Sequence, residues 1–291
     1  FRLKRKKWMN EINLKALAKI NLGLDVTGIR DDGYHEVSMI MQTINLYDRV
    51  TLKKAKADGV FLETNVKYLP VGPKNLCCRA AQLLIDEFKL EPGVKIKLDK
   101  HIPVAAGMAG GSTDAAAVLY GMNKLYDLGL TRQQLMERGV KIGADVPYCL
   151  LRGTALAEGI GEKLTPITPM MKCFVLVAKP PVDVSTKQVY TALDAKFDSV
   201  KHPDITALIR DIESADLKSL CSHMGNVLEE VTIPLHPEIA KIKELMLKGG
   251  AAGSMMSGSG PTVFGLFEDK AKAESAKKLL AESGLCRNIY V

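Results

Sequence analysis

One stretch of small residues constrains the fold of this chain more than any other feature. It runs from Ile102 to Ala117 and reads I-P-V-A-A-G-M-A-G-G-S-T-D-A-A-A. A strand pattern precedes it, and an alanine-rich helix pattern follows its Ser-Thr-Asp run. Small residues let the backbone approach a ligand closely, and the uncovered N–H groups at a helix start attract anions. The stretch therefore predicts a phosphate-binding loop between a strand and a helix.

This loop matches neither of the two common phosphate-binding patterns. No lysine follows its glycines as in G-x-x-x-x-G-K-[ST], and its spacing is not that of G-x-G-x-x-G. An ordinary glycine-rich turn, with Ser112 or Thr113 as the helix cap, stays open as the alternative. The predicted cradle consists of Pro103, Val104, Ala105, Ala106, Gly107, Met108, Ala109, Gly110, Gly111, Ser112 and Thr113.

The composition indicates a folded globular protein. Of the 291 residues, 47% are hydrophobic and 25% are charged, which is ordinary globular usage. These proportions exclude a disordered, a collagen-like and a membrane-embedded chain. The length favours two domains or one large one.

The positive charge is concentrated at the start of the chain. The formal net charge is +7, and residues 1–8 carry five basic side chains and no acidic one, which leaves +2 for the remainder. A basic octapeptide can contact nucleic acid or a membrane surface, but we favour a leader that precedes the folded part. The nearly neutral remainder disfavours an RNA-binding module. We expect a small-molecule substrate, no nucleic-acid partner and no membrane partner, and the oligomeric state stays open.

The cysteine spacing and the length of the apolar runs indicate the cellular compartment of the protein. The six cysteines show no C-x-x-C spacing and no histidine cluster near them, so the sequence suggests neither a zinc site nor a disulfide framework. No run reaches the 18 or so apolar residues of a spanning helix, and the first residues lack the apolar region of a signal peptide. We therefore expect reduced thiols in a cytoplasmic protein.

Apolar periodicity predicts an α+β order of elements rather than a doubly wound one. A domain boundary is expected between residues 163 and 172, where Pro166 and Pro169 interrupt a polar stretch. The predicted strands cover 20–26, 94–98, 174–178, 262–267 and 288–291, and the predicted helices cover 76–88, 114–125, 133–142, 205–212, 239–247 and 270–281.

Lys19 and Asn21 stand two residues apart at the start of an alternating strand in A-L-A-K-I-N-L-G-L. Both side chains therefore project to one face. On that face a lysine could neutralise phosphoryl charge, while an asparagine could orient a substrate hydroxyl. A solvated lysine at a strand end is the alternative interpretation.

Two further segments hold candidate functional side chains. The turn D-D-G-Y-H-E presents Tyr34 beside His35, and a flat ring of this kind can stack on a base, although an exposed turn tyrosine is equally compatible. The segment G-A-D-V-P-Y-C sets Asp145 among small and apolar residues, where a carboxylate needs a partner or a raised pKa. A general base satisfies this requirement, and so does an aspartate that caps the end of the helix predicted over 133–142.

A second loop of glycine and serine, G-S-M-M-S-G-S-G-P-T, occupies residues 253–262, and taken alone it is a flexible connection. Together with A-K-I-N-L, P-x3-G-x-A-G-G-S-T-D-A and G-A-D-V-P, in this order, it makes the chain resemble the GHMP kinases. The resemblance spans about residues 15–261. A-K-I-N-L-x-L followed by D-G-Y-H, with G-A-D-V-P-Y, is similar to the branch that acts on a cytidylated methylerythritol. The departures, Leu17, Met108 and Thr113, remove no reactive group.

The resemblance implies a two-domain α+β fold and a reaction. Residues 9–165 would form the ATP-binding N-terminal domain, with a fold like ribosomal protein S5 domain 2, and residues 166–291 a ferredoxin-like C-terminal domain. ATP and Mg²⁺ would be the cofactors. The reaction would be ATP-dependent phosphorylation of the 2-hydroxyl of the cytidylated methylerythritol, a step of the non-mevalonate isoprenoid pathway. Another small-molecule GHMP kinase, of the homoserine or mevalonate type, is the alternative.

The resemblance also implies roles for individual residues. Asp145 would be the general base for the substrate hydroxyl, and Lys19 would keep that carboxylate ionised and stabilise the transferred phosphoryl group. The cradle from Pro103 to Thr113 would hold ATP. No residue is named as a ligand of the metal, because the sequence does not give its direct ligands. The substrate would contact Asn21, Tyr34, His35, Thr186 and Tyr190.

Overall fold

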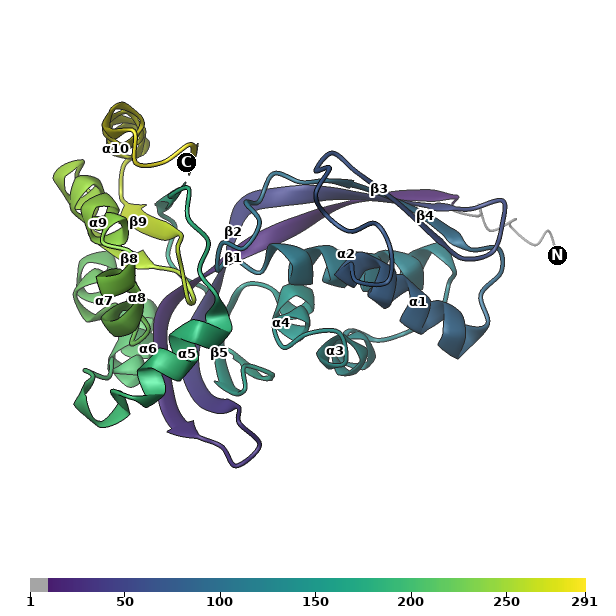
Figure 1. Ribbon diagram of the computed structural model, residues 1–291, viewed down its shortest axis with the longest axis horizontal. Helices are drawn as coiled ribbons and strands as arrows, with labels where there is room; N and C mark the ends of the chain where they lie inside the picture. The colour runs from purple at the N-terminus through teal and green to yellow at the C-terminus, as the bar shows by residue number, and fades with distance from the viewer. Residues whose placement is uncertain (1–9) are drawn as a thin grey trace. The chain divides into compact units, whose positions relative to one another are not determined.

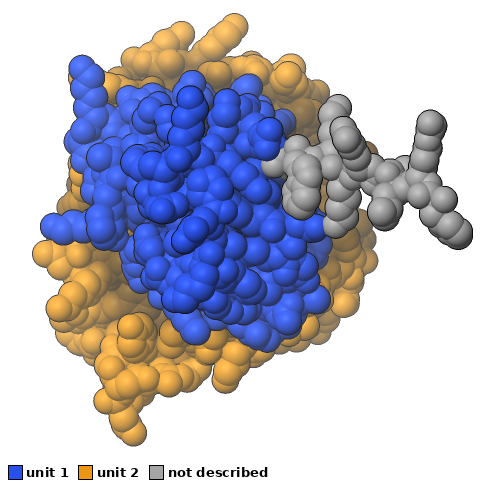
Figure 2. Space-filling view, turned by 90° about the vertical axis from the view of Figure 1, so that its right-hand side faces the viewer, with its two compact units in different colours: residues 1–17, 47–101, 111–151 blue, residues 18–46, 102–110, 152–291 orange. Residues whose placement is uncertain are grey.

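A computed structural model describes residues 10–291, so the basic leader at 1–8 lies outside the described residues. The chain divides into two compact units (Figure 2). The first unit comprises the described residues up to 17 together with 47–101 and 111–151, and the second comprises 18–46, 102–110 and 152–291. The boundary predicted near residue 165 falls within the second unit, so the compact units follow a different division. The two functional domains at 9–165 and 166–291 stay a prediction.

The order of elements along the chain is α+β, as the periodicity predicts (Figure 1). Among the described residues, no helix is both long and apolar enough to span a lipid bilayer. The elements are β1 (Glu11–Ile29), β2 (His35–Lys54), β3 (Val60–Thr64), α1 (Leu76–Phe88), β4 (Val94–Asp99), α2 (Gly110–Leu125), α3 (Arg132–Val140), α4 (Val146–Leu151), β5 (Thr154–Gly159), β6 (Lys163–Pro166), β7 (Phe174–Lys179), α5 (Thr186–Asp194), η1 (Phe197–Ser199), α6 (Ile205–Glu213), α7 (Leu217–His223), α8 (Glu229–Leu235), α9 (Glu238–Lys248), β8 (Gly253–Met256), β9 (Val263–Phe267), α10 (Lys270–Ser283) and β10 (Asn288–Tyr290).

In the first unit, helices cover one face of a small sheet. Residues 49–54 of β2 pair antiparallel with β4, and β3 pairs parallel with β4. Helices α1 and α2 lie along these strands (Figure 1). Asn75 caps α1, because its side chain accepts a hydrogen bond from the Cys77 N–H at 2.9 Å. Helix α2 approaches β2 closely, since a Cβ on Gly121 would lie 2.4 Å from a methyl carbon of Leu52.

In the second unit, residues 37–42 of β2 pair antiparallel with β5, which pairs with β6. A separate antiparallel sheet has the strand order β10-β7-β9-β8, with α9 packed on β8 and β9 and α10 packed on β7. Residues 18–26 of β1 are all buried, so both faces of the strand are covered there, whereas the alternation in the sequence predicted a half-buried strand. Ala18, Ile20 and Leu22 of β1 pack with Leu208 of α6 and Phe264 of β9.

Most predicted elements are confirmed within two residues at each end. The exceptions are the strand predicted over 20–26, which extends over Glu11–Ile29, and the helix predicted over 114–125. Helix α2 begins at Gly110 rather than at 114. The periodicity did not predict β2, β3, β5, β6, β8, α4, α5, η1, α7 or α8. Pro166, placed in a polar linker by the sequence, ends strand β6.

Candidate active site

The predicted phosphate cradle has the backbone geometry of an anion-binding loop. The φ angles are positive at Ala105 (51°), Gly107 (68°) and Ala109 (55°), so every second residue between 105 and 109 is left-handed. Alternation of this kind turns successive N–H groups toward one point. The first N–H groups of α2 also lack an intrahelical acceptor. Ser112 and Thr113 lie inside the first turns of this helix, so the alternative that made either of them its cap is wrong.

The second glycine-serine loop packs against the cradle within the second unit. The Ser257 hydroxyl donates to the Gly107 carbonyl at 3.1 Å, and a Cβ on Gly107 would lie 2.2 Å from the Ser257 carbonyl oxygen. The amide of Asn226 holds this loop by donating to the carbonyls of Met256 and Gly258 at 2.9 and 2.8 Å. The loop is therefore a fixed support of the cradle and not a flexible connection.

Lys19 lies beside the cradle in the same unit. Its backbone N–H donates to the Met108 carbonyl at 3.3 Å. Its ammonium donates to Asn21 Oδ1 at 2.8 Å, and Asn21 Nδ2 is 3.1 Å from the Met39 sulfur. The prediction that Lys19 and Asn21 share a face of the strand is confirmed. Lys19 is 5% exposed, so the interpretation as a solvated strand-end lysine is wrong.

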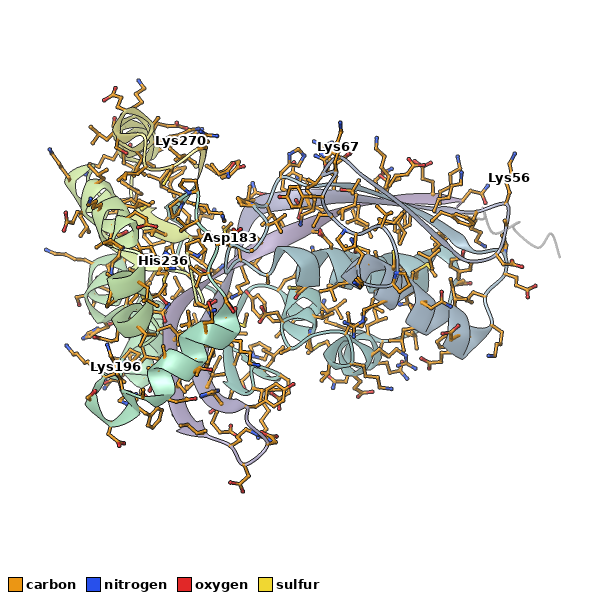
Figure 3. The ribbon with its side chains drawn as sticks, in the orientation of Figure 1. Lys56, Lys67, Asp183, Lys196, His236 and Lys270 are labelled. Carbon is orange, nitrogen blue, oxygen red and sulfur yellow. The ribbon has the colours of Figure 1, made fainter. Side chains whose placement is uncertain are left out.

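Lys19 differs from the other buried lysines of the described residues in the groups that its ammonium contacts. Lysines such as Lys56, Lys67 and Lys196 project from the ribbon and are exposed (Figure 3). The described residues contain three buried lysines, Lys19, Lys100 and Lys179. Lys100 and Lys179 form ion pairs with aspartates, whereas no described carboxylate of its own unit pairs with Lys19. A buried cation requires a negative partner, so this ammonium is suited to an anionic ligand.

Asp145 lies in the first unit, in a turn next to the start of α2. A Cβ on Gly143 would be 3.9 Å from Ser112 Oγ, which places the G-A-D-V-P segment beside the end of the cradle. Asp145 is half-buried and precedes α4, and its carbonyl accepts the Cys149 N–H at 3.1 Å. The alternative of an aspartate capping the end of α3 is wrong, because α3 ends at Val140. Within its own unit, no described residue forms an ion pair with the Asp145 carboxylate.

The structure brings three of the predicted substrate residues to one region of the second unit. His35 begins β2, and its ring lies 4.7 Å from the Tyr190 ring of α5. Asp194 of the same helix lies 2.6 Å from His35 Nε2. Thr186 Oγ1 is 2.9 Å from Ser259 Oγ in the second glycine-serine loop. Tyr34 is 59% exposed, and it makes no ring contact with another described aromatic residue.

Comparison with known proteins places this arrangement in a family. The model of the GHMP kinase N-terminal domain matches residues 75–153, and that of the GHMP kinase C-terminal domain matches residues 208–284. A 4-diphosphocytidyl-2-C-methyl-D-erythritol kinase of Lachnospira eligens is 53% identical over 282 residues, which cover 97% of this chain and 98% of the relative. One from Bacillus subtilis is 48% identical, with 95% and 94% covered. The chain belongs to the 4-diphosphocytidyl-2-C-methyl-D-erythritol kinases of the GHMP kinase family.

Solved structures agree with this family. A crystal structure of 4-(cytidine 5'-diphospho)-2C-methyl-D-erythritol kinase aligns with a TM-score of 0.80 at 33% identity and covers 96% of this chain and 97% of its own. A homoserine kinase from Cytophaga hutchinsonii aligns with a TM-score of 0.76 at 20% identity, covering 99% and 95%. The second comparison shows the two-domain GHMP kinase fold alone. The predicted α+β class and the predicted family are thus confirmed.

Asp194 is the functional candidate in this kinase that sequence reasoning missed. Thr186, Tyr190 and Asp194 are spaced by four residues, which puts them on one face of α5. That spacing was visible in the sequence, but α5 itself was not predicted. The partner of Asp194 lies 159 residues away, so no local pattern could indicate the contact.

The residues of the cradle and Lys19 have the chemistry to hold the phosphates of a nucleotide. The described residues contain no group of three or more His, Cys, Asp or Glu side chains that could hold a metal. Mg²⁺ in kinases is held largely by substrate phosphates and one or two protein oxygens, so such a group is not required. The left-handed cradle residues and the buried Lys19 provide donors and positive charge that suit phosphates.

Proposed function

We propose that this chain transfers the γ-phosphoryl group of ATP to the 2-hydroxyl of 4-diphosphocytidyl-2-C-methyl-D-erythritol, with ADP as the second product. The observation that carries the proposal is Lys19: a buried ammonium with no carboxylate partner in its unit, on a residue whose backbone is hydrogen-bonded to the phosphate cradle. Phosphoryl transfer depends mainly on positioning and on charge stabilisation. Relatives that are 48–54% identical across nearly the whole chain carry the name of this kinase.

Asp145 and Lys19 carry the chemical step in this proposal. The Asp145 carboxylate accepts the proton of the 2-hydroxyl as the oxygen attacks the γ-phosphorus. The Lys19 ammonium donates to the phosphoryl oxygens, whose charge is stabilised best where water is excluded. Asn21, which already holds the Lys19 ammonium at 2.8 Å, orients that group and contacts the substrate.

Residues Pro103 to Thr113 hold the ATP phosphates. The alternating left-handed residues and the start of α2 direct backbone N–H groups at the phosphates without a lysine in the loop. Mg²⁺ bound to those phosphates would neutralise part of their charge. Ser257 keeps the cradle in shape through its bond to Gly107.

The cytidine part of the substrate is assigned to the region around His35. Tyr34 offers an exposed ring that can stack on cytosine, with Tyr190 as the second aromatic residue. His35 supplies a hydrogen-bonding group that is fixed by Asp194, and Thr186 lies on the same face of α5 as Tyr190. A polar site of this kind rejects a base with the wrong donor pattern.

The finer fold assignment and the compartment belong to the same proposal. We assign residues 9–165 to an ATP-binding domain like ribosomal protein S5 domain 2 and residues 166–291 to a ferredoxin-like domain. The four-stranded antiparallel sheet with α9 and α10 packed on it supports the second assignment. All six cysteines are free thiols, which supports a cytoplasmic location.

Release of ADP with a panel of acceptor alcohols tests the proposed function. The purified chain is incubated with ATP and Mg²⁺ and with the cytidylated methylerythritol, homoserine or mevalonate. We expect ADP release above background with the cytidylated alcohol alone. Turnover of homoserine or mevalonate at an equal rate would favour the other GHMP kinases, whose structures share this fold.

A further inference from the structure

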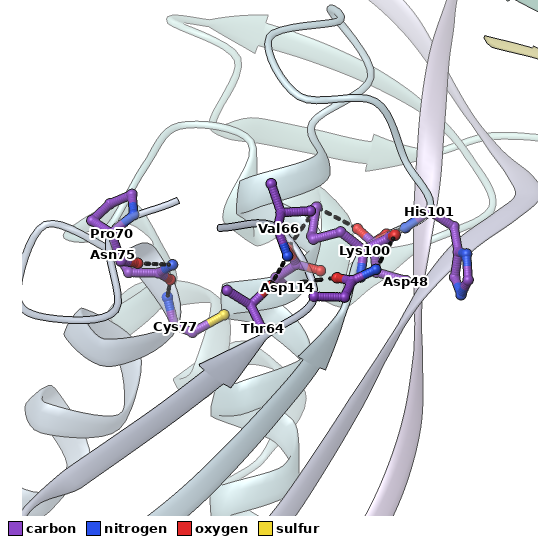
Figure 4. A network of polar contacts seen from close by, with 10 residues as sticks. Asp48, Thr64, Val66, Pro70, Asn75, Cys77, Lys100, His101 and Asp114 are labelled. Carbon is purple, nitrogen blue, oxygen red and sulfur yellow. Dashed lines mark hydrogen bonds and ion pairs between the residues drawn. The ribbon is translucent and has the colours of Figure 1, made fainter. Parts of the chain in front are cut away.

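A cluster of buried charges lies in the first unit, outside the groups that the proposed reaction uses. The Lys100 ammonium contacts Oδ2 of Asp48 and lies 2.7 Å from Oδ2 of Asp114 (Figure 4). All three side chains are buried. The second oxygen of Asp48 accepts the backbone N–H of His101. We call Asp48, Lys100 and Asp114 the buried charge cluster.

The cluster fixes the chain on both sides of the phosphate cradle. Lys100 and His101 precede the cradle, with Ile102 between them and Pro103. The side-chain amide of Asn65 also holds Lys100, because it accepts the backbone N–H of Lys100 at 2.8 Å and donates to its carbonyl at 3.1 Å. Asp114 is the fifth residue of α2, directly after the cradle. The ion pair between Lys100 and Asp114 thus joins the two ends of the segment that contains the cradle.

The cradle itself needs fixed ends. Ala105 and Ala109 adopt left-handed φ angles of 51° and 55°, which are unfavourable for residues with a Cβ. Such conformations persist only where the surrounding structure determines them. Chain ends held by the buried 2.7 Å contact between Lys100 and Asp114 meet this condition, because its two polar groups cannot exchange with water at low cost.

Stability alone does not explain the cluster. Buried ion pairs can often be replaced by apolar side chains of similar volume without loss of stability. Asp114 Oδ1 is also buried without a hydrogen-bond partner among the described residues, which destabilises the folded state. Arrangements that are retained at the expense of stability are typical of functional sites.

We propose that the buried charge cluster positions the cradle for ATP, with Lys100 and Asp114 as positioning residues. This inference rests on the proposed function, in which the cradle binds ATP. Neither residue is required to touch the nucleotide. The ion pair sets the distance between the end of β4 and the start of α2, and so sets where the backbone N–H groups of the cradle point.

Two substitutions of Asp114 test this role. Asp114→Leu removes the acceptor but leaves the neutral Asp48–Lys100 pair, so the variant retains a compensated core. Asp114→Asn keeps an oxygen acceptor for Lys100 and is the conservative rescue. Glu87→Gln, which removes a surface ion pair with Arg138 in the same unit, is the control for a general loss of charge pairing.

Steady-state kinetics and hydrogen exchange are measured on the full chain. We expect Asp114→Leu to raise the KM for ATP about tenfold or more, since displacements near 1 Å can cost about a hundredfold. The KM for the cytidylated substrate should stay within about twofold, and Asp114→Asn and Glu87→Gln should match the parent for both substrates. Amide exchange of residues 103–110 should be faster in Asp114→Leu alone.

Two results would overturn the inference. In one, folded Asp114→Leu keeps the parent's KM for ATP and the parent's exchange in the cradle. In the other, exchange rises evenly over the first unit and both KM values rise together, as expected for a purely structural role. If the parent transfers no phosphate to the cytidylated alcohol, the proposed function fails, while the exchange of residues 103–110 in Asp114→Leu still decides the positioning role.

Discussion

The imidazole of His35 and the carboxylate of Asp194 are joined by a 2.6 Å contact between Nε2 and Oδ1. The contact links the start of β2 to the end of α5, and it holds the His35 ring 4.7 Å from the ring of Tyr190. A carboxylate can only accept here, so Nε2 carries the hydrogen of the contact, and Nδ1 of a neutral His35 remains a hydrogen-bond acceptor. Asp194 is therefore expected to determine how His35 meets the cytosine.

Replacing Asp194 should weaken substrate binding and leave ATP binding unchanged. We expect Asp194→Ala to raise the KM for the cytidylated substrate about tenfold, because a hydrogen bond to a charged group contributes about 1.5–3 kcal/mol. Asp194→Asn, which keeps an oxygen at this position, should have a smaller effect. Asp198→Ala, at an exposed aspartate just beyond α5, is the control. Equal KM values for Asp194→Ala and the parent would remove Asp194 from the site.

Substitution of Lys19 should separate activity from stability. We expect Lys19→Met to lower turnover by at least about a hundredfold, the usual effect of removing a group that stabilises the transition state. Its melting temperature should equal or exceed that of the parent, because the buried ammonium has no carboxylate partner among the described residues of its own unit, and such a group destabilises the fold. Lys56→Met, at an exposed lysine, should change neither quantity. Near-normal turnover of Lys19→Met would exclude Lys19 from the chemical step.

Asp145→Asn should lower turnover to a similar degree while the chain remains folded. An amide cannot accept the proton of the substrate hydroxyl, and loss of a general base costs about 10²–10⁴-fold in rate. Binding of ATP and of the cytidylated substrate, measured by calorimetry, should change little. A variant that turns over at half the parental rate or faster would contradict the assignment of Asp145 as the base.

Local patterns predicted the longer helices well, but they missed the 20-residue strand β2 and the glycine-rich first turn of α2. The strand period at 20–26 and the Asn75 cap of α1 are local signals, and the structure confirms the strand and the cap, although it buries both faces of the strand at residues 18–26. The first turn of α2 was missed because Gly110 and Gly111 have low helix propensity. Helix α4 is six residues long and contains Pro147, so it shows no helical period.

In the candidate site, too, local sequence patterns predicted some features and missed others. Lys19 and Asn21 could be placed on one face from strand period alone, and the cradle from its small residues. Two contacts could not be predicted from the sequence: the hydrogen bond from Ser257 to Gly107 and the contact between His35 and Asp194. They join residues that are 150 and 159 positions apart. Such contacts depend on tertiary packing, which no local pattern records.

The close approach of the two loops predicts an effect of Gly107→Ala that exceeds backbone strain. A left-handed φ costs an alanine about 1–2 kcal/mol, and Gly129, with a φ of 70° and open space around it, should show that cost alone. At Gly107 the new methyl group would also lie 2.2 Å from the Ser257 carbonyl oxygen. Chemical denaturation should therefore show a greater loss of stability for Gly107→Ala than for Gly129→Ala, and only the former should weaken ATP binding. Equal losses of stability for the two variants would mean that the cradle and the loop at 253–262 move apart without cost to make room for the methyl group.

Burial, with a smaller contribution from the neighbouring Asp48, raises the pKa of Asp114 well above its usual range, although Lys100 opposes the shift. The folded state then binds more protons than the unfolded state between the usual pKa of 3.8 and the raised pKa. The resulting stability is present at low pH and is lost as the pH rises through that interval, by up to about 1.4 kcal/mol per pH unit. Asp114→Asn should remove this slope, so the free energy of unfolding of the variant should rise relative to that of the parent as the pH rises above 3.8. Parallel curves for the two proteins would show that Asp114 is ionised.

The position of the new phosphate on the product tests the central claim most directly. The chain is incubated with ATP, Mg²⁺ and the cytidylated methylerythritol labelled with ¹³C at carbon 2, and the product is examined by ³¹P and ¹³C NMR. We predict one phosphate per ADP released, with phosphorus coupled to carbon 2, and no such product from Asp145→Asn. Phosphate on another hydroxyl, or ADP release without a phosphorylated alcohol, would contradict the account.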